Sequence, residues 1–365
     1  MKILSKQDLH DILYGCTILG TGGGGTIESG LSRVEAALAA GKEFKLCSMD
    51  EMKDDDWLCV PYFCGALTYG DGEDPLARLK KMDEPAPLLA FEAMEEYLGV
   101  RFEGVLSTAL GGGNTAEAFY VAAMKDRVIV DADPAGRSVP ELQHSTFFVY
   151  DIPITPMAVA DAYGDTAILP KAADDFRAED WVRALAVASN NSVGVIDHPG
   201  TAGTMRGKLI DGAISYALEI GKARRLALEA GKNAADKVTA AGKGKILFKG
   251  TIGKAEWESR EGFTFGDIYV DGEADSEYAG HDYRIWYKNE NIISWLDGQI
   301  HATVPDLICV IDDKTGEPVQ NPRAEVGMDV TVFALPAPKE WTTSRGLEVF
   351  GPKHFGYDIE YKPIV

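Results

Sequence analysis

The spacing of apolar residues predicts alternating helices and strands in the first third of the chain. Leu9, Ile12, Leu13 and Cys16 recur at helical spacing within residues 6–19. After this helix, strand-like apolar runs at residues 44–47, 57–63, 105–107 and 128–130 alternate with helical patterns at residues 31–41, 88–98 and 116–124. The alternation predicts an α/β layer built on a mostly parallel sheet.

The hydrophobic period changes from helical to alternating at Lys245. A long helical pattern runs from Leu209 to about Ala234, and strand-like segments follow at residues 246–252, 265–270, 283–287, 292–295, 299–304, 307–311 and 330–335. Asp-Gly pairs at 271–272 and 297–298 are typical of the turns between such strands. We therefore predict an antiparallel β sandwich or barrel in this part of the chain.

The length of 365 residues favours two domains over a single core. The charge-rich stretch at residues 171–180 follows several prolines and marks the expected boundary. The fold-class prediction is α/β. Residues 1–168 form an N-terminal α/β domain, and residues 169–365 form a C-terminal domain in which a helical segment precedes the β-rich part.

Charge and hydropathy narrow the function classes. The chain has 36 Lys and Arg against 57 Asp and Glu, which gives a net charge of −21. Such a surface repels phosphate backbones and anionic lipid, so we expect neither nucleic acid nor a membrane as a partner. No apolar run approaches the roughly 20 residues that span a bilayer, and the first residues lack a signal-peptide core, so we expect a cytoplasmic location.

Cysteine and histidine offer few catalytic candidates. The five cysteines are an odd number without a C-x-x-C pair, which argues against a disulfide framework or a zinc knuckle. Cys64 precedes a glycine-rich acidic loop and is a candidate nucleophile, but no cation beside it in the sequence would stabilise a thiolate. His198, in a glycine-containing turn, is expected to be a satisfied structural residue, with a position facing a cleft as the alternative. His301, on the polar face of a strand, is expected at the surface.

Two glycine-rich loops are candidate substrate-binding elements. Five glycines fill six positions at residues 20–25, between two predicted helices, and their backbone N–H groups would suit an anion or a planar polar ring. A second loop, Gly111–Asn114, lies at a strand-to-helix turn, where Asn114 would cap the helix or contact a ligand. Tight backbone packing is the alternative for both loops. The candidate binding residues are Thr21, Gly22, Gly23, Gly24, Gly25, Gly112, Gly113 and Asn114.

The segment 131–141 is the candidate catalytic turn. It follows the buried run 128–130, and open α/β sheets bind their ligands at the ends of such strands. Four charged residues lie within eleven positions, namely Asp131, Asp133, Arg137 and Glu141. They indicate either a site for a polar substrate or metal, or a turn held together by ion pairs. Because strands and helices alternate before it, this turn and both glycine loops are expected on one side of the sheet.

Several stretches together resemble the S-methyl thiohydantoin desulfurase family, which is associated with hydantoinase and oxoprolinase systems. The stretches are residues 19–25, 111–114, 131–141, 289–291, 304–308, 351–352 and 355–358, which lie in order along nearly the whole chain. The resemblance implies an α/β N-terminal part, a β-rich C-terminal part, and hydrolytic removal of a methylthio group from a thiohydantoin ring. The sequence departs from the family pattern at Ala109, where a glutamate is usual, and at Gly65-Ala66-Leu67, where Gly-Ala-Pro is usual.

The resulting hypothesis is a hydrolase of a five-membered cyclic amide or thioimidate. Asp133 or Asp131 would act as base toward water, directly or through a divalent metal whose presence the sequence leaves open. Arg137 or the backbone of residues 21–25 would stabilise negative charge on the ring, and Asn114 would orient it. The alternative is a non-catalytic or regulatory subunit of a hydantoinase-type complex. Beyond the small-molecule substrate, we expect a homo-oligomer, with hydantoinase-type subunits as further candidate partners.

Overall fold

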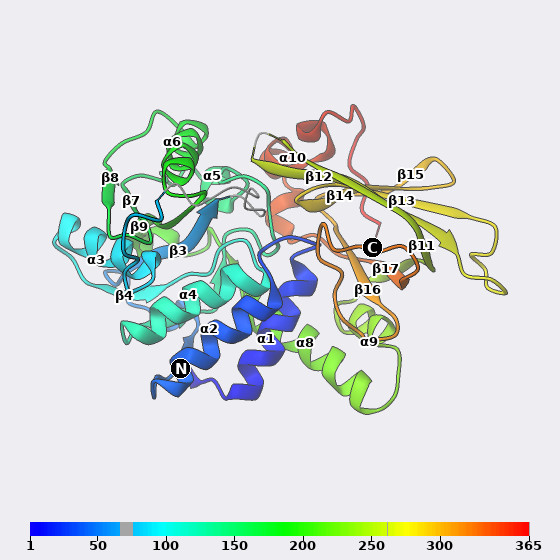
Figure 1. Ribbon diagram of the computed structural model, residues 1–365, viewed down its shortest axis with the longest axis horizontal. Helices are drawn as coiled ribbons and strands as arrows, with labels where there is room; N and C mark the ends of the chain where they lie inside the picture. The colour runs from blue at the N-terminus through cyan, green and yellow to red at the C-terminus, as the bar shows by residue number, and fades with distance from the viewer. Residues whose placement is uncertain (66–75, 261, 365) are drawn as a thin grey trace.

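The computed structural model describes residues 1–65, 76–260 and 262–364. Its N-terminal part is built on an eight-stranded sheet (Figure 1). The strand order is β1-β2-β5-β4-β3-β9-β7-β8. The bounds are β1 (Lys2–Ile3), β2 (Lys45–Cys47), β3 (Trp57–Gly65), β4 (Phe102–Val105), β5 (Val128–Val130), β7 (Met157–Ala160), β8 (Thr166–Leu169) and β9 (Ser192–Thr201). The four strands β2, β5, β4 and β3 are parallel, and antiparallel strands flank them on both sides.

Helices cover both faces of this sheet. The first face carries α1 (Lys6–Leu19), α2 (Ile27–Ala39), α3 (Ala86–Leu98) and α4 (Gly112–Met124), and the second carries α5 (Thr146–Val149), α6 (Asp175–Ala188) and α7 (Ala202–Met205). Alternate residues of β3 pack into the hydrophobic layers on opposite faces of the sheet. Cys59 packs with the helices of the first face, and Leu58 and Val60 pack with those of the second. The sheet is therefore apolar on both faces, as expected for an α/β fold.

The C-terminal part is a seven-stranded antiparallel sheet in the order β15-β14-β13-β12-β11-β17-β16. The bounds are β11 (Lys245–Arg260), β12 (Phe263–Gly272), β13 (Asp282–Lys288), β14 (Glu290–Leu296), β15 (Gln299–Thr303), β16 (Leu307–Asp312) and β17 (Asp329–Leu335). Strands β14 and β16 contact each other although they are not neighbours in this order, so the sheet curls into an open half-barrel. The predicted fold class, an α/β part followed by antiparallel β structure, is confirmed.

One of the hydrophobic clusters joins the two parts. Helices α8 (Ala213–Glu229) and α9 (Ala234–Ala241) lie under the C-terminal sheet, and α8 packs along α1 (Figure 1). A Cβ atom on Gly15 would lie 1.8 Å from the carbonyl oxygen of Ala217, so the two backbones are in direct contact. Leu307 and Leu335 of the C-terminal sheet belong to the same core cluster as these helices. Strand β9 of the N-terminal sheet comes from the segment after residue 169, where the C-terminal domain was predicted to begin.

The long helix predicted over residues 209–234 is shorter in the structure. Gly212 has a φ of 75° and lies just before α8, where the chain enters the helix, and α8 ends at Glu229. Gly221 fulfils the expected packing role, because a Cβ atom there would lie 1.7 Å from the carbonyl oxygen of Asp11. Within the described part of the chain, no helix has both the length and the apolar composition that a membrane crossing requires.

Candidate active site

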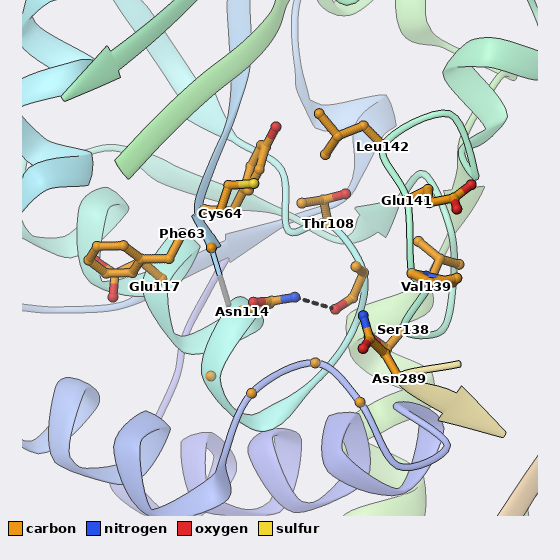
Figure 2. Close-up of a pocket in the computed structure, with 18 of the residues that line it drawn as sticks. Phe63, Cys64, Thr108, Asn114, Glu117, Ser138, Val139, Glu141, Leu142 and Asn289 are labelled. Carbon is orange, nitrogen blue, oxygen red and sulfur yellow. Dashed lines mark hydrogen bonds between the residues drawn. The ribbon is translucent and has the colours of Figure 1, made fainter. Parts of the chain in front are cut away.

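The three predicted loops meet around one cavity of about 570 Å³. Its wall is built from the glycine loop at 23–25, the end of β3, the start of α4, the turn at 138–142, and the first residues of β14. Figure 2 shows Cys64 and Glu141 on opposite sides of this space, with Asn114 and Ser138 between them. The expectation that the loops lie on one side of the sheet is confirmed. The volume suits a small-molecule ligand.

The two glycine loops pack against each other through their backbones. Gly24 has a φ of 80°, and a Cβ atom on it would lie 2.6 Å from Cα of Gly111. The carbonyl oxygen of Gly24 accepts hydrogen bonds from the N–H groups of Gly113, at 3.1 Å, and Asn114, at 3.0 Å. Close packing therefore accounts for much of the glycine content. The packing also leaves Gly23, Gly24, Gly25, Gly113 and Asn114 at the cavity wall.

The other predicted binding residues lie behind this wall. Thr21 is buried and its Oγ1 accepts a hydrogen bond from Arg137 at 2.7 Å. The carbonyl oxygen of Gly22 accepts one from the N–H of Asn321 at 2.9 Å. Gly112 packs against the backbone of Ile27. These three residues support the loops, and a direct role in binding stays a prediction for them.

Asn114 reaches the loop that carries Ala109. The Nδ2 atom of Asn114 donates a hydrogen bond to the carbonyl oxygen of Ala109 at 3.3 Å. Ala109 has a φ of 51° and lines the cavity at the position where the resembled family usually carries glutamate. The second departure from that pattern, at Ala66 and Leu67, falls outside the described residues.

The two aspartates of the turn accept hydrogen bonds from backbone N–H groups. Asp131 accepts hydrogen bonds from the N–H groups of Ile214 and Ser215, both at 2.9 Å, and so caps the N-terminus of α8 from another segment. Asp133 is fully buried, and its Oδ1 accepts from the N–H groups of Ala135 and Gly136 at 2.7 Å, while its Oδ2 has no hydrogen-bond partner in the described part of the chain. Burial raises the pKa of Asp133 to about 7. Neither lines the cavity, and their assignment as catalytic residues stays a prediction.

Arg137 joins the N-terminal turn to the C-terminal sheet. It is fully buried, and its guanidinium donates to oxygens from five residues, which are Thr21, Ser138, Asn291, Pro305 and Asp306. Burial lowers its pKa to about 10, which still leaves the group charged at neutral pH. Since it does not line the cavity, the structure gives it a positioning role, and direct charge stabilisation stays a prediction.

Glu141 lies in a cluster that the sequence analysis did not assemble. Its carboxylate pairs with Lys288 and accepts from Gln143, and its Oε2 lies 3.6 Å from Nε2 of His144 and 3.8 Å from Nε2 of His354. Burial would raise the pKa of Glu141, but the hydrogen bond from His354 and the charges of His144 and Lys288 hold it well below its usual value. Burial lowers the pKa of His144 to about 3. Glu141 and His144 line the cavity.

Asp197 and His198 form a hydrogen-bonded pair at the cavity wall. Nδ1 of His198 lies 2.8 Å from Oδ1 of Asp197, and Oδ2 of Asp197 accepts a hydrogen bond from Tyr62 at 2.7 Å. The imidazole stacks on Phe147 with ring centroids 4.2 Å apart, and the backbone of His198 has a φ of 42°. Nε2 of His198 is buried and has no hydrogen-bond partner among the described residues. The expectation that His198 is a satisfied structural residue is therefore wrong for this nitrogen.

Glu290 is a second unsatisfied group at the same cavity. It is buried, its Oε1 accepts a hydrogen bond from Ser138 at 2.8 Å, and no residue that the structure describes bonds to its Oε2. Burial raises its pKa to about 7. A Cβ atom on Gly23 would lie 1.9 Å from Oε1 of Glu290, so glycine is what lets the first loop approach this carboxyl group.

Three further ionisable residues are candidates for a place at the cavity, namely Cys64, Glu117 and His301. Cys64 lines the cavity, and burial raises its pKa to about 12, so it is a thiol and not a nucleophilic thiolate. Glu117 also lines the cavity and pairs with Arg33 at 3.0 Å, and burial raises its pKa to about 7 against the effect of that arginine. His301 lies away from the cavity, with Nδ1 3.2 Å from the hydroxyl of Tyr283.

The sequence held partial signals for the missed residues. Glu290 belongs to the Asn289–Asn291 stretch that carries the family resemblance, but nothing in its neighbourhood revealed its burial. His354 lies between the two resembling C-terminal stretches, 351–352 and 355–358. His144 stands three positions after Glu141, a spacing that places both side chains on one side of a helical turn. No local pattern connects His354 with them across 210 residues.

Comparisons with known proteins agree with this architecture. Family models of the S-Me-THD-like N-terminal and C-terminal domains match residues 7–171 and 173–364. The fold is similar to a crystal structure of a protein from Chromobacterium violaceum, with a TM-score of 0.77, 24% sequence identity and full coverage of both chains. No curated protein matches the sequence. Because the family matches together extend over nearly all of the chain, this protein belongs to the S-Me-THD-like family.

Proposed function

We propose that the protein is a hydrolase that acts on a five-membered S-methyl thiohydantoin or hydantoin-like ring within this cavity. The observation that carries the proposal is that four residues lining this cavity each have a buried polar atom without a hydrogen-bond partner among the described residues. These atoms are Nε2 of His198, Oε2 of Glu290, Oε1 of Glu117 and Nδ1 of His144. Buried polar groups in native proteins are nearly always hydrogen-bonded, so four exceptions at one cavity favour a ligand or a reaction there. The family name supports the choice of ring.

His198 is the proposed general base. A proton on Nδ1 donates to Asp197, which leaves a lone pair on Nε2. The bond from Tyr62 fixes the carboxylate of Asp197, and stacking on Phe147 fixes the imidazole plane. An imidazole oriented in this way can accept a proton from an attacking water, which is the usual division of work between a histidine and its orienting carboxylate.

Glu290 is the proposed general acid. With a pKa of about 7, a large share of its carboxyl groups carry a proton at neutral pH. Water adds to the ring carbon that bears the methylthio group as His198 takes one proton, and the C–S bond then breaks. The leaving thiolate takes a proton from Glu290, and His198 restores that proton through solvent. The products are a hydantoin and methanethiol. Water supplies the new ring oxygen and the two hydrogens that the products gain.

The remaining predicted residues would position the substrate. The backbone of Gly23–Gly25 and the side chain of Asn114 line the cavity and offer polar contacts to ring carbonyl and nitrogen atoms. Arg137 would act indirectly, because it holds Thr21 and the backbone beside Glu290 in place. Asp131 and Asp133 would keep the turn in shape through the backbone N–H groups that they accept.

The test is incubation of the purified protein with S-methyl thiohydantoins, unmodified hydantoins and small lactams. A thiol reagent detects methanethiol, and mass spectrometry identifies the ring product. Release of methanethiol with formation of the matching hydantoin supports the proposal. If no ring is hydrolysed, the protein is not an enzyme of this class, and the regulatory-subunit alternative gains support.

A further inference from the structure

Glu141, His144 and His354 bring three ligand-type atoms together, and we refer to them as the Glu141 cluster. Nε2 of His144 and Nε2 of His354 lie 2.8 Å apart, and Oε2 of Glu141 lies 3.6 Å and 3.8 Å from them. The first two residues belong to the turn before α5, and the third belongs to the 3₁₀ helix η3 (Pro352–Phe355). The fold therefore assembles the cluster from distant parts of the chain.

Local structure fixes each member of the cluster. The N–H of His144 donates to the carbonyl oxygen of Glu141 at 3.1 Å, so a single turn directs both side chains the same way. The N–H of His354 donates to Gly351 at 3.1 Å, which closes the turn of η3. The imidazole of His144 is fully buried and packs edge-on against Phe350, with ring centroids 5.0 Å apart. This rigid setting suits a preformed ligand site.

We propose that the Glu141 cluster binds one divalent transition-metal ion, with zinc as the best match. Two imidazole nitrogens and one carboxylate oxygen are a ligand set found in catalytic zinc sites, where a fourth position stays open for water or substrate. Tetrahedral zinc with ligand bonds of about 2.0–2.1 Å separates its ligand atoms by about 3.3 Å. The separations of 2.8, 3.6 and 3.8 Å lie on both sides of that value. Small side-chain movements therefore suffice to place an ion.

The neighbours of Glu141 orient it toward the imidazoles. Lys288 pairs with Oε1, so Oε2 is the oxygen that faces the two histidines, and Gln143 donates to Oε2 as well. Hydrogen-bonded partners of this kind commonly hold metal-binding carboxylates in place. The positive charge of Lys288 opposes a cation, but its ion pair with Oε1 offsets part of that repulsion.

The location of the cluster suggests a role in the reaction, and this part of the inference rests on the proposed function. Glu141 and His144 line the cavity, so an open coordination position would be accessible from it. A metal ion there would supply Lewis-acid polarisation to a bound water or ring oxygen. Zinc also binds sulfur ligands readily, which suits a substrate that carries a methylthio group.

The test is zinc titration of the full-length protein after chelator treatment, followed by isothermal calorimetry. Co²⁺ provides a second readout, because its visible absorption reports tetrahedral coordination. The variants are His354→Ala and Glu141→Gln, and His354 is a safe position because 23% of its side chain is exposed. The matched control is His281→Ala, which removes a histidine paired with a carboxylate, Asp297, at 2.6 Å on the C-terminal sheet.

We expect one zinc ion per chain in the wild type, at least tenfold weaker binding in both cluster variants, and unchanged binding in His281→Ala. Absence of stoichiometric binding in the wild type, or equal binding by all variants, would overturn the metal site. Zinc binding without hydrolysis of any ring leaves the metal site standing and contradicts the proposed function. Hydrolysis without any zinc binding contradicts the metal site alone.

Discussion

Nδ1 of His198 lies 2.8 Å from Oδ1 of Asp197, the residue directly before it in β9. A side chain rarely bonds to that of its neighbour in a strand, because successive side chains point to opposite faces. Here the backbone of His198 has a φ of 42°, outside the strand region, and this local distortion brings the two groups together. Strained backbone of this kind clusters at functional sites.

Replacement of Asp197 by asparagine should lower turnover at least tenfold while the protein stays folded. The amide cannot accept from both Tyr62 and His198, so the imidazole loses its orienting partner. The measurement is kcat/KM on the best ring substrate, with circular dichroism to check folding. Asp297→Asn is the control, since it alters an aspartate–histidine pair far from the cavity. Equal effects of both substitutions would contradict the orienting role.

Glu290→Gln should remove the alkaline limb of the pH–rate profile. As pH rises through about 7, Glu290 loses the proton that the leaving group needs, so wild-type activity should fall there. Glutamine keeps an acceptor for Ser138 but has no acidic proton, so we expect a rate loss of about 10²-fold or more without that limb. Glu117→Gln is the control, because Glu117 also has a pKa of about 7 in this cavity. If the alkaline limb is lost in Glu117→Gln and kept in Glu290→Gln, Glu117 and not Glu290 is the general acid.

Asp133→Asn should reduce the dependence of stability on pH. The folded-state pKa of Asp133 is raised from 3.8 to about 7, so the folded state binds its proton more tightly than the unfolded chain does. The protonated carboxyl group therefore contributes a few kcal/mol, in order of magnitude, to the free energy of unfolding. The contribution is complete below about pH 4 and is lost as pH rises to about 7. Urea unfolding at pH 5 and pH 8 measures the difference. An unchanged difference in the variant would show that Asp133 is not a source of it.

Arg137→Lys should destabilise the protein by several kcal/mol. A lysine cannot reach acceptors on five residues at once, and buried carbonyl oxygens without donors each cost about 1–3 kcal/mol. Urea unfolding measures the loss in the free energy of unfolding. The control is Arg323→Lys, which alters an exposed ion pair with Glu28 and should change this free energy by less than about 1 kcal/mol. A small effect at Arg137 would contradict its role as the link between the two parts.

Gly24→Ala and Gly41→Ala should separate close packing from backbone strain. Both glycines have positive φ, 80° and 72°, but only Gly24 has a backbone neighbour within reach of a Cβ atom. We expect about 1–2 kcal/mol for Gly41→Ala from the left-handed conformation alone, and a clearly larger loss for Gly24→Ala. Similar losses in the two variants would mean that the loop can move away from Gly111.

The fold was largely predictable because the spacing of apolar residues along the sequence indicates which segments form helices and which form strands. The alternating pattern after residue 245 corresponds to strands β11 to β17, and the runs at 44–47, 57–63 and 128–130 correspond to β2, β3 and β5. Closure of the C-terminal sheet was not predictable, since the contact between β14 and β16 depends on twist and register shifts that leave no periodic signal.

The candidate site was predictable only in part. The loops were identified through glycine content and strand ends, which are local signals. Glu290 and His198 depend instead on burial and on partners from other segments, such as Ser138 and Tyr62. Asp131 and Asp133 stood out as charges near a strand, yet their oxygens accept mainly backbone N–H groups, a distinction that a sequence does not contain.

The most direct test of the account is kcat/KM for an S-methyl thiohydantoin in the wild type, His198→Ala and the control His301→Ala. We expect methanethiol release by the wild type, a loss of about 10²–10⁴-fold in His198→Ala, and little change in His301→Ala. Full activity in folded His198→Ala, or no release by the wild type with or without added zinc, would contradict it.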